Sequence, residues 1–133
     1  MVATLIAGCG GGALKAPTTS PVSGSVTLKG KPAPGVRVHL HPQFDIGDVK
    51  FVPSGETGAD GAFTLSTAAP GDGAPPGDYI VTLEKPRVVS DRNQSGIEVE
   101  IDDFKGKYSD PTKSTWTVTI TEGTNQLQPF VLE

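Results

Sequence analysis

The stretch VSGSVTLKGKPAPGVRVHL, residues 22–40, decides the fold. In its first part apolar residues such as Val26 and Leu28 alternate with polar ones, and this alternation is typical of a half-buried β-strand. Residues 29–35 are rich in Gly and Pro and predict a turn. Alternation resumes in residues 36–40. The stretch therefore predicts two strands joined by a turn.

Outward from this stretch, the chain repeats the same pattern in short segments separated by turns. Further strands are expected within residues 50–52, 63–65, 79–83, 97–101, 115–121 and 126–132. Asp60 and Gly61 predict a tight hairpin turn, because Gly supplies the positive φ that such turns require. Leu127 is out of phase with Phe130, and a bulge near Pro129 would correct the phase.

About seven short strands at this spacing predict an all-β fold, an antiparallel β-sandwich of the prealbumin-like or Ig-like Greek-key type. Gly and Pro account for 17 and 12 of the 133 residues, which excludes long helices as the main element. The alternating positions predict a core of Val26, Leu28, Val36, Val38, Leu40, Phe63, Leu65, Tyr79, Val81, Leu83, Trp116, Val118 and Ile120.

Composition restricts the possible partners. The net charge is -4 and no Lys/Arg cluster occurs, so a nucleic-acid partner is not expected. A single Cys excludes an intrachain disulfide framework.

That Cys lies in a segment that predicts a targeting signal. The segment LIAGC, residues 5–9, has the form of a lipobox, in which small residues precede a Cys that is acylated and becomes the first residue of the mature chain. We expect Cys9 to carry a lipid anchor. Only eight residues precede it, without Lys or Arg, so the signal peptide is short of its usual form and we expect the true start to lie upstream. The alternative is an apolar terminus with an incidental Cys.

The chain then divides into three parts. Residues 1–9 are a residual signal peptide with the lipobox, and residues 10–21 are a linker rich in Gly, Ser, Thr and Pro that we expect to be flexible. Residues 22–133 are the β-sandwich domain. The expected location is the bacterial cell envelope, with the protein exported and anchored at the outer membrane or the periplasmic face.

Two candidate metal sites are weak. His39 and His41 share one strand face, but zinc needs three or four protein ligands, and their alternation with Val38 and Leu40 predicts that they face solvent. Five carboxylates fall in loops or turns, namely Asp45, Asp48, Asp60, Asp72 and Asp78. Calcium needs about six oxygen ligands at close spacing, whereas Asp is an ordinary turn residue. No metal or cofactor is expected, and a weak calcium site stays open.

Catalytic groups are not recognisable in the sequence. Glu98, Glu100 and Asp102, next to Asp103, alternate with Ile97, Val99 and Ile101, which favours a solvated strand face over acid–base chemistry. The Thr residues of 115–121 are expected on a strand surface. Trp116 keeps phase with the core, although an exposed ring there would serve as a platform for a sugar.

Four motifs, in order, resemble those of carboxypeptidase-regulatory-like (transthyretin-like) domains. Residues 22–38 resemble the opening of that family, where a Gly-x-Val strand runs through a Gly-Lys-Pro turn into a Gly-Val-x-Val strand. TGADGAF, residues 57–63, resembles its Thr-Asp-x-Asp-Gly-x-Phe hairpin, and PPGDYIV, residues 75–81, its Pro-Gly-x-Tyr strand entry. KYSDP, residues 107–111, with Ser114 and Trp116, is similar to the closing segment of small bacterial lipoproteins of this type.

The resemblance covers residues 21–133 and implies a prealbumin-like sandwich, and it does not imply an enzyme. The first Asp of the family hairpin is Gly58 here, which removes half of a carboxylate pair that could have bound a cation. The expected function is a non-catalytic, lipid-anchored envelope module with a structural or protein-interaction role. The alternative is an envelope lipoprotein that binds a glycan or a peptide.

Overall fold

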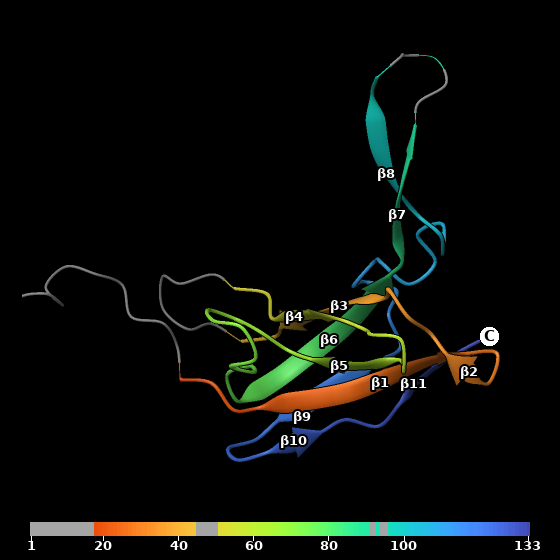
Figure 1. Cartoon of the computed structure of the whole chain (residues 1–133). Coiled ribbons are helices and arrows are strands. Elements are labelled where there is room, and N and C mark those ends of the chain that lie inside the picture. Colours follow the sequence, from red (N-terminus) through yellow and green to blue (C-terminus); the bar gives the residue numbers. More distant parts are fainter. Residues whose placement is uncertain (1–17, 45–50, 91–92, 94–95) are drawn as a thin grey trace, which may run out of the picture.

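A computed structural model of the chain describes residues 18–44, 51–90, 93 and 96–133. These residues form strands and turns, as the sequence predicts, and the all-β sandwich is confirmed. Eleven strands occur in the described part of the chain, more than the seven expected, because several of them span only two or three residues. Two sheets pack face to face, and a third, two-stranded sheet projects from them (Figure 1).

The first sheet is built around β1 (Val22–Leu28). On one edge β1 pairs antiparallel with β2 (Lys31–Pro32) and β5 (Ala62–Thr64). On the other edge it pairs parallel with β10 (Asn125–Gln126) and β11 (Phe130–Leu132). This sheet is therefore mixed, because the last segment of the chain runs alongside β1 in the same direction.

The second sheet is antiparallel throughout. Its order is β4 (Ser54–Glu56), β3 (Arg37–Pro42), β6 (Gly77–Glu84) and β9 (Thr117–Ile120). The prediction of a strand at residues 50–52 is wrong. Lys50 lies outside the described residues, Phe51 and Val52 are not in a strand, and β4 begins at Ser54. The sequence Ser-Gly-Glu of β4 has no apolar alternation, so the pattern could not locate it.

The third sheet is a hairpin of β7 (Pro86–Ser90) and β8 (Glu98–Asp102). Figure 1 shows it standing out from the two packed sheets, directly after β6 in the chain. We call these two strands, together with the adjoining Ile97, the arm.

The core lies between the two packed sheets. Ten of the thirteen predicted core residues are buried there, whereas Leu28, Trp116 and Val118 are only partly buried against it. Five further residues of the buried hydrophobic core were not predicted: Val22, Ala33, Ala74, Phe130 and Leu132. Tyr79 places its ring in this core and its hydroxyl donates to the carbonyl of Pro75. Burial raises the pKa of that hydroxyl.

The predicted bulge near Pro129 is confirmed by the register of β1 with the end of the chain. Val22 pairs with Asn125 and Val26 pairs with Phe130, so the offset between partners grows by one residue between β10 and β11. The extra residue restores the phase, and Phe130 and Leu132 both reach the core.

Part of the predicted linker is described, and it packs against the domain. Ser20 is buried and exchanges backbone hydrogen bonds with Ala74, at 2.9 and 3.0 Å. Residues 10–17 of the linker and Cys9 lie outside the described residues. In the part of the chain that is described, no helix has the length and hydropathy needed to cross a membrane.

Candidate interaction surface

The arm has two different faces, which follow from its register. Val89 is opposite Val99, and Arg87 is opposite Ile101. Residues directly opposite in an antiparallel pair share a face, so these four lie on one side, as does Ile97. Val88 is opposite Glu100 on the other side. One face is therefore mainly apolar, and the other carries acidic side chains.

The apolar side chains of the arm are open to solvent. Among the described residues six large hydrophobic side chains are exposed, and four of them belong to the arm: Val88, Ile97, Val99 and Ile101. Val88 is 58% exposed and Ile97 is 44% exposed. A two-stranded hairpin is marginally stable by itself in water, and a concentration of exposed apolar surface marks a site of contact with another molecule.

The base of the arm is fixed to the body by polar contacts. The carboxylate of Asp102 accepts hydrogen bonds from the backbone N–H groups of Lys85, Phe104 and Gly106, at 2.9 to 3.0 Å. Arg87 donates to Asp103 at 2.8 Å. These contacts give Asp102 and Asp103 structural roles in the turn after β8, in place of the solvated strand face expected for them. Glu98 and Glu100 are exposed, as predicted.

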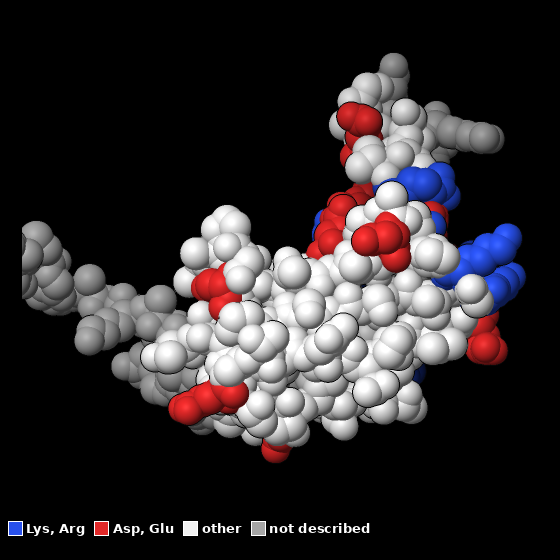
Figure 2. Space-filling model, turned by 60° about the horizontal axis from the view of Figure 1, so that its bottom comes forward, with Lys and Arg blue, Asp and Glu red and all other residues white. Residues whose placement is uncertain are grey.

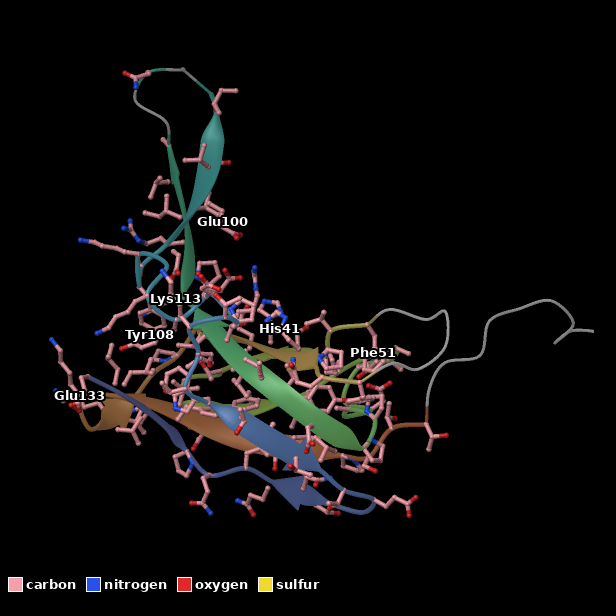
Figure 3. All side chains as sticks on the ribbon, turned by 180° about the vertical axis from the view of Figure 1, so that it is seen from behind. His41, Phe51, Glu100, Tyr108, Lys113 and Glu133 are labelled. Carbon is pink, nitrogen blue, oxygen red and sulfur yellow. The ribbon has the colours of Figure 1, made fainter. Side chains whose placement is uncertain are left out.

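Below the arm, the outer face of the second sheet holds a polar cluster. Arg37 Nη1 lies 3.2 Å from Glu84 Oε1 and 3.5 Å from Glu100 Oε1, so it joins the sheet to the arm. His39 Nε2 is 3.5 Å from the same oxygen of Glu84. Figure 3 shows Glu100 on the arm and His41 on the sheet below it.

His39 and His41 lie on the outer face of the second sheet, opposite the buried Val38 and Leu40, as their alternation predicts. Both are half-buried, and they line a small cavity of about 360 Å³ with Thr82, Glu84 and Ser109. His41 Nε2 lies 2.8 Å from the hydroxyl of Thr82. Ser109 comes from a segment that lies along the edge of β6, where the backbone N–H of Leu83 donates to the carbonyl of Tyr108 at 2.9 Å, and it lines the cavity beside the two His rings. Alternation along a strand cannot reveal such a distant neighbour.

The environment of His41 disfavours its charged form. Partial burial is the main cause and the neighbouring His39 ring adds to it, so the pKa of His41 is below its usual value. Among the described residues no group of three His, Cys, Asp or Glu is placed to hold a metal ion.

Asp60 and Asp72 act on their own turns, and the carboxylate of Asp60 accepts from the backbone of Ala62 at 3.1 Å. The prediction that Asp78 lies in a loop or turn is wrong, because it belongs to β6 and accepts from the hydroxyl of Thr119 on the paired strand β9 at 2.6 Å. Asp72 accepts three backbone N–H groups of residues 67–69. Desolvation opposes ionisation of Asp72, but these bonds outweigh it and its pKa is below the usual value. Asp45 and Asp48 lie outside the described residues.

A second surface feature lies on the first sheet. A groove of about 850 Å³ runs where β5, β1 and the segment after β10 meet. Its lining includes the hydroxyls of Ser23 and Ser25, the amide of Gln126 and the carboxylate of Asp60. In Figure 2 charged side chains gather on and beside the arm, and much of the body's face shown there is uncharged.

Trp116 is only half-buried, in contrast to the full burial expected for a core residue. Its ring packs against those of Tyr108 and Phe130, with centroids 5.4 and 5.7 Å away. It also lines a cavity of about 320 Å³ with Gln126 and Gln128. The Thr residues at 115, 117, 119 and 121 are exposed, as predicted.

No family model matches this chain, and no curated protein is significantly similar to it. Two solved structures share part of its shape. A 9R-lipoxygenase from Cyanothece aligns with 90% of this chain at 14% identity and a TM-score of 0.47, and the chain covers 18% of that protein. A proposed carbohydrate-binding protein from Pseudomonas aeruginosa aligns with 90% at 16% identity and a TM-score of 0.46, over 91% of its own length. At these values neither likeness says what this chain binds.

Sequence reasoning did not single out the arm as a site. It found the alternation of Ile97, Val99 and Ile101, but assigned those residues to an ordinary half-buried strand. The pairing partner is Pro-Arg-Val-Val-Ser, which does not alternate. One sequence signal could have indicated the arm. Val88 and Val89 are two apolar residues that follow Pro86 and belong to no strand that the alternation predicts.

Proposed function

We propose that this chain is a non-catalytic, lipid-anchored module of the bacterial cell envelope that binds another protein through the arm. The carrying observation is that four of the six exposed large hydrophobic side chains in the described part of the chain lie on the arm. The lipobox sequence at residues 5–9 supports the anchor. The family resemblance of residues 21–133 supports a module without enzymatic activity.

The polar cluster below the arm does not favour a reaction. The hydroxyl of Thr82 is within hydrogen-bond distance of His41, which is the pairing a nucleophile would need. However, Thr82 is only 3% exposed, so little of it is open to a substrate in the cavity that it lines. The charged groups of Arg37 and Glu84 form an ion pair with each other, so neither is directed at a bound substrate.

The test compares apolar side chains on the arm with one on the body. Val99→Ser combined with Ile101→Ser should abolish the capture of the envelope partner by the tagged, detergent-solubilised protein. Val131→Ser is the matched control, because Val131 is 59% exposed but lies on β11. Equal thermal unfolding midpoints would show that the variants are folded. Equal capture by the wild type and the arm variant would refute the proposal.

The groove on the first sheet favours a second candidate function, the binding of a glycan. Its volume is in the range of small-molecule sites, and hydroxyl, amide and carboxylate groups are those that bind sugar hydroxyls. Asp60→Ala and Gln126→Ala should weaken the binding of oligosaccharides to the protein, measured by calorimetry. Exposed Thr119→Ala should not. Absence of oligosaccharide binding by the wild-type protein would remove this candidate.

A further inference from the structure

The arm offers one strand edge that is better suited to a partner than the other. β7 and β8 pair only with each other among the described strands, so each has a free edge. β7 begins with Pro86, which has no N–H to donate and weakens that edge as a template. β8 consists of Glu, Val, Glu, Ile and Asp, with no Pro. Its outward N–H and C=O groups are therefore available for another strand.

The side chains of β8 define what such a strand must carry. Ile97, Val99 and Ile101 form an apolar row, with the latter two 39% and 38% exposed. Glu98 and Glu100 form an acidic row on the opposite face and are also exposed. The carboxylate of Glu100 lies 3.5 Å from Arg37 of the body and stays 54% exposed beside it. Because neighbouring strands place side chains opposite one another on each face, a partner strand needs apolar residues on one face and basic residues on the other.

A second copy of this chain does not meet that requirement. If β8 paired antiparallel with β8 of another copy, the two acidic rows of Glu98 and Glu100 would lie on the same face, side by side. Like charges directly opposite in a sheet are destabilising. A parallel pairing through the same edge turns one copy over, so that each acidic row would lie beside the apolar row of the other copy. The acidic row thus acts against self-association and in favour of a partner of opposite charge.

We infer that the partner engages the free edge of β8 with an extended segment in which apolar residues alternate with Lys or Arg. This inference rests on the proposed function and specifies its partner. The segment adds a third strand to the arm by backbone hydrogen bonds. Its apolar side chains cover Val99 and its neighbours, and its basic side chains lie beside Glu98 and Glu100.

The probe is a capped peptide of alternating Lys and Val, about seven residues long to match a typical strand. Its binding to the full chain in detergent is followed by fluorescence polarisation, beside a peptide with Glu in place of Lys. The Lys peptide should bind about tenfold more tightly, since two favourable charge pairs are replaced by two unfavourable ones. A Lys peptide N-methylated at alternate residues should lose binding, because it cannot form the backbone hydrogen bonds.

The charge-reversed arm supplies the second half of the test. Glu98→Lys with Glu100→Lys should reverse the preference, so that the Glu peptide binds more tightly. Glu122→Lys with Glu133→Lys is the matched control, because it makes the same change in net charge at exposed positions off the arm and should keep the Lys preference.

Three results would overturn the inference: no binding of either peptide, a preference that follows net charge in both double variants, or undiminished binding of the methylated peptide. In each of these cases the proposed function would keep its support if the wild type captures the envelope partner and the Val99→Ser, Ile101→Ser variant does not. The arm would then bind its partner by another mode, so failure of the inference and failure of the proposed function can be told apart.

Discussion

The hydroxyl of Thr57 lies 2.6 Å from the carbonyl oxygen of Ala33 and donates a hydrogen bond to it, although the two residues are 24 positions apart. The hydroxyl oxygen of Thr57 also accepts a hydrogen bond from the backbone N–H of Val36 at 2.8 Å. Thr57 is buried, as are Ala33 and Val36. The side chain of Thr57 therefore joins the turn before β3 to the hairpin turn that follows β4.

Thr57→Val should lower the free energy of unfolding by about 1–3 kcal/mol, because the buried carbonyl of Ala33 and N–H of Val36 lose their partner. Thr64→Val is the control, since Thr64 is also in this region but is exposed, and a surface change should stay within about 0.5 kcal/mol. Denaturant titration measures both. Equal midpoints for the two variants would show that the Thr57 bonds contribute nothing.

Gly73→Ala should destabilise the domain more than Gly71→Ala. Both glycines have a positive φ, at 92° and 73°, so Ala is strained at either by about 1–2 kcal/mol. Only at Gly73 would the added Cβ collide with backbone, the carbonyl of Ser20, whereas nothing lies within 4 Å at Gly71. Thermal unfolding of both variants measures the difference. Similar losses would mean that Ser20 does not pack against the domain.

Acidification should destabilise the fold through His41. Its pKa is lowered in the folded state by burial and by His39. The unfolded chain therefore takes up a proton first as the pH falls below about 6.5. Stability should be constant above that pH and should decline below it. His41→Gln should flatten the decline in this range, measured by urea midpoints against pH. A decline unchanged in His41→Gln would assign it to other groups.

Cys9→Ser should release the native, exported protein from the membrane. In the proposed anchor the thiol of Cys9 accepts the lipid, and a hydroxyl in its place would leave the chain without an anchor. In detergent phase partitioning the wild-type product should enter the detergent phase and the variant the aqueous phase. If both forms stay in the aqueous phase, Cys9 carries no lipid.

Much of the sandwich can be predicted from local patterns because its strands obey them. Val26 and Val38 keep strict alternation and are buried, and the phase error at Leu127 correctly predicts the bulge before Phe130. Trp116 shows the limit of what alternation along a strand can predict. Its phase indicates the core side, but the extent of its burial depends on Tyr108 and Phe130, which come from other segments.

The arm could not be recognised because its defining property is non-local. The alternation in residues 97–101 is the same as that of a half-buried strand, and periodicity does not say whether a sheet will cover it. Among the described strands β8 pairs with β7 alone, and Ile97, Val99 and Ile101 stay exposed. The partial burial of His39 and His41 is likewise non-local, since the cavity that they line is completed by the distant Ser109.

Site-specific photo-crosslinking tests the role of the arm most directly. A photoreactive phenylalanine analogue is placed at Val99 on the arm, or at Val131 on the body, and the protein is irradiated in intact envelopes. The account predicts a discrete crosslinked adduct from position 99, lost when Ile97→Ser and Ile101→Ser are added, and none from position 131. No adduct at position 99, or the same adducts from both positions, would contradict it.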